Sequence, residues 1–423
     1  MINDADIIII GAGAAGLMAA ADLSESGKKI LILEARQRIG GRILTLRKGQ
    51  EVLEAGAEFV HGELPLTIQL LRESGIRYHK TGGKMERSKK GEWVRQKTFG
   101  YGWSDLLEKM DEMEEDMALG DFLNIYFGGD QYVELRNSVR GYAEGFDLAD
   151  TSRASTLALY EEWSNESDSQ FRIEGGYDKL SNFLFEKCLS NGCKLEIGRV
   201  VNRVEWRKDH ATVFAYGEKS YHAKKVLVTV PLGVLQQENK IGSIRFSPTL
   251  GGSMQLFRDI GYGSVIKILL DFKKPFWEEH QENLGFIFSD QRVPTWWTQV
   301  PAKSNLLTGW LGGSLEKIRL ASEHDLLELA IDSLSKIFSI AKAKLDEELG
   351  SSHIFNWSED PFSVGAYSFS TPTTKEARLQ LREPFAHTLY FAGEALYDGD
   401  SPGTVEAALQ NGRDVAERIA CEI

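Results

Sequence analysis

The stretch Ile7-Ile8-Ile9-Ile10-Gly11-Ala12-Gly13-Ala14-Ala15-Gly16 decides the fold of this chain. The run of isoleucines predicts a fully buried strand, and the spaced glycines after it predict a tight turn that opens a helix. In such a turn the first glycine permits the bend, and the second lets the backbone approach a pyrophosphate. The third glycine lets the helix pack closely against the strand.

A helix over 17–26 and a strand over 29–34 complete the expected βαβ unit. Glu34 ends that second strand, where its carboxylate can accept the ribose hydroxyls of a dinucleotide and disfavours the 2′-phosphate of NADP. The helix N-terminus offers N–H groups and the positive end of a dipole to phosphates. The residues predicted to bind the dinucleotide here are Gly11, Gly13, Ala14, Ala15, Gly16 and Glu34.

Composition limits the remaining possibilities. The chain has 423 residues and a net charge of −13, from 49 basic and 62 acidic residues. This profile predicts a globular protein of two domains that repels nucleic acid and anionic lipid. Cys188, Cys193 and Cys421 are too few for a disulfide framework and lack the spacing of a metal site. No apolar run reaches about 18 residues, so we expect no membrane span and a cytoplasmic protein.

The rest of the chain alternates between strand and helix patterns. Residues 63–165 are predicted to be helical and charged, with the acidic run 111–116 on a solvated helix face. This alternation predicts an α/β fold in which two domains exchange the chain several times. Strands are expected over 194–197, 200–206, 212–216, 225–230, 264–272 and 388–391, and helices over 322–340 and 404–421.

The segment that follows the second strand carries a family resemblance. Glu34-Ala35-Arg36-Gln37-Arg38-Ile39-Gly40-Gly41-Arg42 resembles the FAD-binding signature of the flavin-containing amine oxidase family. Further segments resemble amine-oxidising members, in the family's order and over essentially the whole chain. These segments are 54–62, 226–235, 262–277, 391–394 and 402–406.

The resemblance implies the architecture and the cofactor. An FAD-binding Rossmann-like domain (1–62, 170–243 and 384–423) would be interleaved with an α+β substrate domain (63–169 and 244–383). Arg42 would be a fixed cation beside the flavin and diphosphate. The further residues that the resemblance assigns to FAD are Ala35, Arg36, Gly41, Arg42, Gly56, Ala57, Glu58, Val201, Gly393, Glu394, Thr404 and Val405.

Trp357 and Tyr367 match the family's aromatic residues, which flank the amine over the flavin. An aromatic face attracts a cationic head group and aligns the carbon to be oxidised. Covalent monoamine oxidases carry a flavin-linked cysteine immediately before this tyrosine, whereas this chain has Ala366, so we expect FAD to be bound non-covalently. Thr404 stands where the second aromatic of the monoamine oxidase cage would fall. The resulting half-open cage favours longer or secondary amines.

Lys267 interrupts the apolar run Val265-Ile266-Lys267-Ile268-Leu269. A lysine in a buried strand is costly unless it has polar partners, the alternative being an edge strand that reaches solvent. In the family this lysine points at the flavin through a water, where it assists reoxidation by oxygen and imine hydrolysis. We therefore expect Lys267 to be catalytic, together with Tyr367, Trp357, His61 and Thr404.

The loop from Glu58 to His61 separates two rival activities. L-amino acid oxidases carry an arginine at about the position of Phe59, where it clamps the substrate carboxylate, and phenylalanine cannot do this. His61 instead matches the histidine of animal-type polyamine oxidases. The alternative for His61 is a hydrogen-bonded core histidine. Glu144 and Asp147 are either distal cation contacts or structural caps. The expected reaction is the FAD-dependent oxidation of a C–N bond of a (poly)amine to an imine, with O2 reduced to H2O2. An L-amino acid oxidase and a non-catalytic flavin-binding protein remain alternatives, and the sequence leaves the oligomeric state open.

Overall fold

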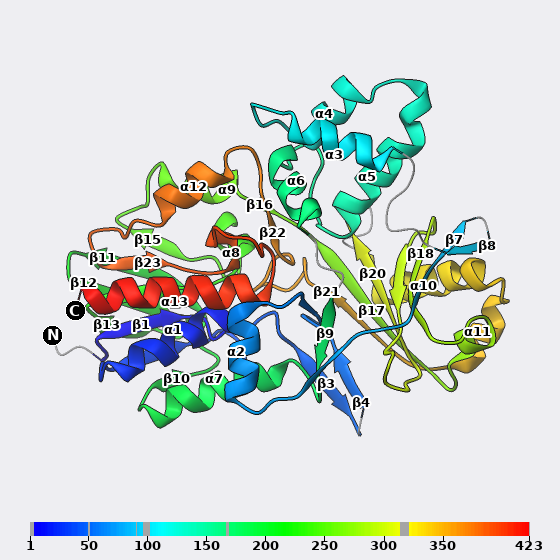
Figure 1. The fold of residues 1–423 in the computed structure, drawn as a ribbon. Helices are drawn as coiled ribbons and strands as arrows, with labels where there is room; N and C mark the ends of the chain where they lie inside the picture. The colour runs from blue at the N-terminus through cyan, green and yellow to red at the C-terminus, as the bar shows by residue number, and fades with distance from the viewer. Residues whose placement is uncertain are drawn as a thin grey trace.

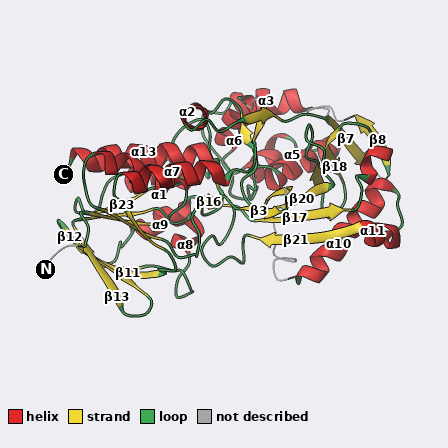
Figure 2. Ribbon diagram, turned by 90° about the horizontal axis from the view of Figure 1, so that it is seen from below, coloured by secondary structure: helices red, strands yellow, loops and turns green. Residues whose placement is uncertain are grey.

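The computed structural model describes residues 4–49, 51–89, 91–95, 102–165, 169–313 and 321–422. Figure 1 shows both termini beside the parallel sheet that contains β1, a second large sheet at the opposite side of the molecule, and a helical lobe above their junction. Figure 2 shows the same halves from below, with the long strands β17 and β21 beside α10 and α11.

The isoleucine run forms β1 (Ile7–Ile10), at the centre of a parallel sheet. Ile7 and Ile9 pack with the helices on one face, while Ile8 and Ile10 pack with strands on the other. Both faces of β1 are therefore buried, as a near-continuous apolar strand requires. The sheet order is β10 (Lys194–Glu196), β2 (Ile30–Leu33), β1, β14 (Lys225–Val228) and β23 (Leu389–Phe391).

Helices cover one face of this sheet and a smaller sheet covers the other. On the helical face, α1 contacts both α7 and α13. The helices are α1 (Ala14–Glu25), α7 (Asp178–Ser190), α13 (Val405–Cys421) and the adjacent α2 (Pro65–Glu73). The smaller sheet has the order β13 (Lys219–Ala223), β12 (His210–Ala215), β11 (Val201–Arg207) and β15 (Arg245–Ser247), and near it lie α8 (Leu232–Gln236), α9 (Ser253–Asp259) and α12 (Thr374–Leu381).

The second large sheet packs against α10 (Glu323–Phe338) and α11 (Lys342–Glu348). Along its strand β17, Ile266, Ile268 and Leu270 face these helices. Because side chains alternate along a strand, Lys267 points to the other face, toward the first half of the molecule. The order is β21 (Leu349–Asn356), β17 (Val265–Phe272), β20 (Leu306–Gly312), β19 (Thr295–Trp297), β18 (Leu284–Ser289), β7 (Lys84–Lys89) and β8 (Glu92–Arg95).

The remaining elements form the helical lobe and the connections between the halves. The lobe has its own apolar core, which includes Trp103, Phe122 and Trp163. Its helices are α3 (Trp103–Asp111), α4 (Leu119–Tyr126), α5 (Val133–Gly145) and α6 (Thr156–Ser164). The connections are β3 (Thr45–Lys48) with β4 (Glu51–Glu54), β5 (Val60–His61) with β9 (Gln170–Ile173) and β6 (Tyr78–Lys80), β16 (Gly261–Tyr262) with β22 (Ser368–Phe369), and the 3₁₀ turns η1 (Asp130–Tyr132), η2 (Phe276–Glu279) and η3 (Glu394–Leu396).

The α/β fold with a parallel nucleotide sheet is confirmed, but several local expectations were wrong. The first helix begins at Ala14 instead of residue 17, and residues 78–95 contain strands where helices were predicted. Only Asp111 of the acidic run 111–116 belongs to α3, and residues 112–116 follow it in a loop instead of lying on a helix face.

The proposed domain boundaries remain a prediction. Elements α2, β15, α9 and α12 fall in the segments assigned to the substrate domain. All four pack with the nucleotide sheet or its flanking layers. Among the residues that the structure describes, no helix is long and apolar enough to cross a membrane, and no group of three acidic, histidine or cysteine side chains is placed to hold a metal ion.

Candidate active site

A cavity of about 2010 Å³ joins the parallel sheet to the second large sheet. It begins at the carboxyl ends of β1 and β2, beside Ile10 and Leu33, and reaches Lys267, Trp357 and Tyr367. Pockets for single small molecules usually occupy about 300–1,000 Å³. This cavity therefore has room for a dinucleotide and for a second molecule beyond it.

The glycine turn forms a narrow cradle at the nucleotide end. Gly11 has φ +112°, which favours glycine, and Gly13 is the N-cap of α1 and has no capping side chain. A Cβ added to Gly41 would lie 3.3 Å from the Cα of Gly13, so any side chain there would crowd the cradle. Gly16 does not line the cavity, and a Cβ on it would clash with the carbonyl oxygen of Gly11. The turn thus brings bare backbone and the start of a helix to the cavity.

Glu34 is buried at the end of β2 and lines the same cavity. Its two carboxylate oxygens accept hydrogen bonds from the N–H groups of Ala12 and Arg36, each at 2.8 Å. Each oxygen keeps a further lone pair. Glu34 therefore holds the glycine turn in place and can also accept a hydroxyl from a bound ribose.

Two arginines flank the cradle, and each has a carboxylate partner. The Arg42 guanidinium lies 3.0 Å from Glu394 and also donates to the carbonyl oxygen of Ala366. Burial opposes the charge on Arg42, but Tyr262 and Glu394 outweigh it and raise the pKa of Arg42. Arg36 lies 2.5 Å from Asp360, so its guanidinium ties the second strand to a distant loop.

With the exception of Gly16, every residue predicted to bind the cofactor lines this cavity. The cradle, the buried acceptor Glu34 and the cationic Arg42 fit the pyrophosphate and ribose of a dinucleotide such as FAD. The residues of this set not discussed above are Ala14, Ala15, Ala35, Gly56, Ala57, Glu58, Val201, Gly393, Thr404 and Val405.

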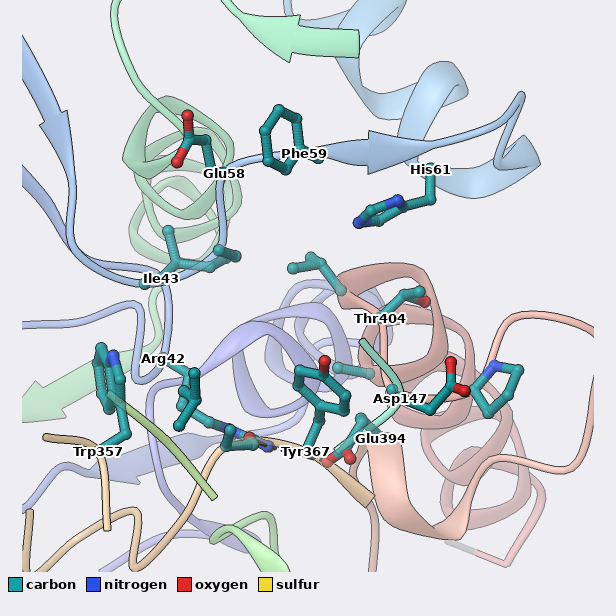
Figure 3. Close-up of a pocket in the computed structure, with 18 of the residues that line it drawn as sticks. Arg42, Ile43, Glu58, Phe59, His61, Asp147, Trp357, Tyr367, Glu394 and Thr404 are labelled. Atoms are coloured by element: carbon teal, nitrogen blue, oxygen red, sulfur yellow. Dashed lines mark hydrogen bonds and ion pairs between the residues drawn. The ribbon is translucent and has the colours of Figure 1, made fainter. Parts of the chain in front are cut away.

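Aromatic side chains line the other end of the cavity. Trp357 is buried and donates from its indole N–H to the carbonyl oxygen of Ala55 at 2.9 Å. The Tyr367 hydroxyl donates to the carbonyl oxygen of Phe146. Figure 3 shows Trp357 and Tyr367 on one side of the cavity and Glu58, Phe59 and His61 along the facing strand. The hydrogen bonds fix both rings, so each presents a set orientation to the space between.

Thr404 lines the cavity, but its hydroxyl has a structural task. It is the N-cap of α13, where it accepts from the N–H of Ala407 at 3.1 Å and donates to the carbonyl oxygen of Ser401 at 2.7 Å. A threonine at this position satisfies the exposed N–H groups of the first turn. A contact from Thr404 to a substrate stays a prediction.

His61 presents its ring to the cavity between two aromatic neighbours. The ring centroids of Phe59 and Phe146 lie 5.9 Å and 6.2 Å from that of His61, and the Gln170 amide nitrogen lies 3.4 Å from Nδ1. His61 is exposed to the cavity, and partial desolvation by the protein around it lowers its pKa, which favours the neutral ring. His61 is therefore a neutral imidazole near pH 7.

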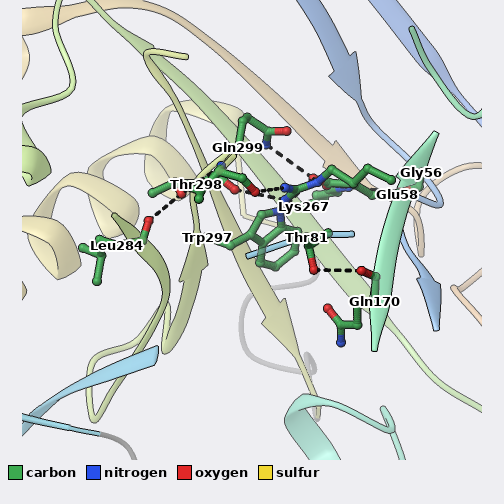
Figure 4. Close-up of polar contacts among 11 residues, drawn as sticks. Gly56, Glu58, Thr81, Gln170, Lys267, Leu284, Trp297, Thr298 and Gln299 are labelled. Atoms are coloured by element: carbon green, nitrogen blue, oxygen red, sulfur yellow. Dashed lines mark hydrogen bonds and ion pairs between the residues drawn. The ribbon is translucent and has the colours of Figure 1, made fainter. Parts of the chain in front are cut away.

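Lys267 occupies the middle of β17, between β20 and β21, and is 1% exposed. The edge-strand alternative is therefore excluded. Its ammonium donates to Glu58 Oε2 at 2.8 Å and to the carbonyl oxygen of Gly56 at 3.0 Å, and it lies 5.5 Å from the centroid of the Trp297 ring. Figure 4 shows Gly56, Glu58 and Trp297 gathered around Lys267.

Glu58 holds a second cation that sequence reasoning did not find. Arg172 of β9 donates from Nε to Glu58 Oε1 at 3.0 Å, and the Trp297 indole N–H donates to the same oxygen at 3.0 Å. Burial acts to raise the pKa of Glu58, but Lys267 and Arg172 together lower it to about 2. Arg172 lies 114 positions from Glu58 in the chain, so no local motif marks the pair.

The position of Arg172 matters for the substrate, because L-amino acid oxidases clamp the substrate carboxylate with an arginine and none was expected near Phe59. Its guanidinium lies 4.6 Å from the centroid of the Phe59 ring, close to the position where a clamp would be needed. However, it is not part of the cavity wall, and its remaining nitrogens donate to the carbonyl oxygens of Thr298 and Val300. An arginine that is bound on all sides in this way is not available to a substrate carboxylate.

The sequence left the roles of Glu144 and Asp147 open between cation contacts and structural caps. Asp147 lines the cavity and accepts the indole N–H of Trp163 at 2.9 Å. Glu144 does not line it; this carboxylate accepts the Thr151 hydroxyl at 3.1 Å, and burial raises its pKa. Of the two, Asp147 is the one that lines the cavity.

Comparison with known sequences finds a family. A family model described as flavin containing amine oxidoreductase matches residues 14–124 and 94–420. Human lysine-specific histone demethylase 2 is 28% identical over 461 residues, covering 99% of this chain and 54% of the demethylase. Polyamine oxidase 2 of Arabidopsis thaliana is 26% identical over 447 residues, covering 97% of this chain and 87% of the oxidase. The chain spans only about half the length of the histone demethylases it matches.

Comparison with solved structures supports the same fold. Putrescine oxidase bound to putrescine superposes with a TM-score of 0.80 at 21% identity, covering 99% of each chain. Cyclohexylamine oxidase from Brevibacterium oxydans IH-35A gives the same TM-score, identity and coverage.

Proposed function

The chain belongs to the flavin-containing amine oxidoreductase family, and from this premise we propose that it is an FAD-dependent amine oxidase. The proposed reaction oxidises a C–N bond of an extended amine or polyamine to an imine and reduces O2 to H2O2. The observation that carries the proposal is the continuous cavity, which joins the glycine cradle to the fixed aromatic rings and the buried Lys267.

The chain's own residues would divide the work. Bound FAD supplies the redox chemistry. Glu34, Arg42 and the glycine turn hold the cofactor, and Ala366 leaves it without a covalent link. Trp357 and Tyr367 orient the amine, while Lys267 presents a hydrogen-bond donor at the cavity wall.

We infer the substrate class from the charged side chains at the cavity wall. Arg172, whose guanidinium lies against the Phe59 ring, is already bound by Glu58 and by backbone carbonyls, so this arginine does not offer a clamp for a carboxylate. Asp147 is an acid on the wall that can attract a second ammonium group of the substrate. Both features favour an extended amine over an L-amino acid.

An aerobic substrate panel tests the proposal. Purified protein would be mixed with putrescine, spermidine, spermine, an N-methyl-lysine peptide, a simple arylalkylamine and L-amino acids, and the peroxide released would be measured. We expect peroxide with an extended amine and none from flavin-stripped protein, the matched control. A preference for an L-amino acid would support the rival oxidase, and flavin without turnover on any amine would support a non-catalytic flavin protein.

The way in which the cofactor is held gives a second test. Acid or heat should release FAD into the supernatant, because Ala366 cannot form a thioether with the flavin. Flavin that stays with the precipitated protein would contradict non-covalent binding.

A further inference from the structure

Glu58 lies where several segments distant in sequence meet at the cavity wall. It precedes β5, and its carboxylate contacts Lys267 of β17 (Figure 4). The same carboxylate also contacts Arg172 of β9. Trp297 of β19 and the amide of Gln299 complete the set, at 3.0 Å and 3.3 Å from Oε1. The proposed function gives Lys267 a task but leaves this carboxylate without one.

The two carboxylate oxygens of Glu58 have different partners. Oε1 accepts from Arg172, Trp297 and Gln299, whereas Oε2 accepts from Lys267. Lys267 and Glu58 line the cavity, while Arg172 lies behind them. A buried carboxylate between two cations is stable only if both partners stay in place, because removing one leaves an uncompensated buried charge. Arg172 therefore anchors Glu58 from behind, and Glu58 holds Lys267 at the front.

The hydrogen bonds of the Lys267 ammonium determine which of its N–H groups is left for a molecule in the cavity. An ammonium has three N–H donors. Glu58 Oε2 and the carbonyl oxygen of Gly56 take two of them, and among the described residues the third N–H has no acceptor. Because Lys267 lines the cavity, that third donor is available to a water, or to oxygen, in the cavity.

We propose that Glu58 is a positioning residue, which acts through Oε2 to hold the Lys267 ammonium at the cavity wall with one N–H directed to the reacting molecule. The proposal rests on the proposed function, since it assigns the pair to the reaction of the reduced cofactor with O2. A purely structural role, in which Glu58 only joins the two halves of the molecule, is the competing explanation.

Reoxidation of bound flavin separates these explanations. The flavin would be reduced photochemically in the absence of any amine and mixed with O2 in a stopped-flow instrument. We expect Glu58→Gln and Lys267→Met each to slow reoxidation by about tenfold or more, because each removes a charged hydrogen bond. The double variant should lie within about twofold of the slower single variant, because the two residues act as one unit. Glu58→Asp, which keeps the charge, should recover part of the rate.

A matched carboxylate and a second readout complete the design. Glu54 is a nearby, partly buried carboxylate that does not line the cavity, so Glu54→Gln should leave reoxidation unchanged. Denaturation of flavin-stripped protein should show that Glu58→Gln and Lys267→Met are non-additive in stability as well. The visible spectrum of bound FAD verifies that each variant still holds the cofactor.

The outcomes are distinct. Reoxidation of Glu58→Gln at the parent rate would overturn the proposal, as would slowing factors that multiply in the double variant or equal slowing by Glu54→Gln. If Glu58→Gln does not fold, the cycle is run with Glu58→Asp, for which we expect a smaller slowing; reoxidation at the parent rate, or slowing factors that multiply in the double variant, would again overturn the proposal. No amine enters this assay, so a protein that oxidises no amine would refute the proposed function while the test of Glu58 still stands. A protein that holds no flavin would refute both.

Discussion

Glu54→Gln should stabilise the protein, and only at neutral and alkaline pH. Glu54 ends β4 and is largely buried, and burial raises its pKa from about 4.5 to about 7. The Tyr177 N–H at 2.6 Å and the Thr45 hydroxyl at 2.8 Å pull in the opposite direction without cancelling the effect. A glutamine fits the same place, because its oxygen can accept from Tyr177 while its amide donates to the Thr45 oxygen.

The sign and size of the effect follow from proton linkage. Below pH 4.5, Glu54 is protonated in the folded and unfolded states, so its ionisation costs nothing. As the pH rises toward 7, the unfolded chain loses the proton first, and stability is lost. Above pH 7, a difference of about 2.5 pKa units corresponds to about 3 kcal/mol. At about 2.1 cal/mol/K per residue, 423 residues give an unfolding entropy of about 0.9 kcal/mol/K, and hence a Tm gain of about 3–4 °C.

Calorimetry of the parent and Glu54→Gln between pH 4.5 and about 9 measures this effect. Only the difference between the two proteins is used, because the other titrating groups then cancel. We expect that difference to be near zero at the acid end and to grow through neutral pH. A difference that is constant with pH, or one in which the variant is less stable at every pH, would refute the reasoning.

Three further substitutions test other parts of the structure. Glu34→Ala should weaken FAD binding roughly tenfold to a hundredfold and destabilise the flavin-stripped protein, because the N–H groups of Ala12 and Arg36 lose their acceptor; fluorescence titration measures the affinity, and unchanged affinity would mean that the site is misplaced. His61→Gln should keep every inflection of the parent's rate–pH profile between about pH 5 and 9, because the lowered pKa of His61 keeps its ring neutral there; loss of an inflection near neutral pH would contradict this. Glu406→Gln should cost about 1–3 kcal/mol, because its carboxylate accepts both N–H groups at the start of α2; an unchanged Tm in calorimetry would contradict that assignment.

Local sequence was sufficient to predict those elements whose conformation depends on their own residues. The unit β1–α1–β2 could be predicted because buried isoleucines and spaced glycines determine strand and turn within one short stretch. Strands β6 to β8 could not, because β7 is polar and half-exposed and owes its conformation to pairing with β18, about 200 residues away. Strand propensity of this kind depends on tertiary partners that a local pattern does not contain.

The same distinction applies to the residues of the site, some of which have a local sequence signal and some of which do not. Lys267 could be found because a lysine within an apolar strand requires an explanation from its own neighbours. Its actual partner, Glu58, is 209 positions away, so neither the ion pair nor the anchoring Arg172 had a signal in any one motif. The capping role of Thr404 has a local signal, since a threonine directly before a helical run is a common N-cap, whereas a substrate contact of Thr404 rests on the family resemblance alone.

The central claim is that an amine placed in the cavity reduces the bound cofactor. Anaerobic mixing of the purified protein with spermidine, spermine or putrescine, followed by the visible absorption of oxidised flavin, measures this step without oxygen. The account predicts loss of that absorption with at least one of these amines, and its return with stoichiometric peroxide when oxygen is admitted. Flavin that stays oxidised with all of them, but is reduced by an L-amino acid or by nothing in the panel, would contradict it.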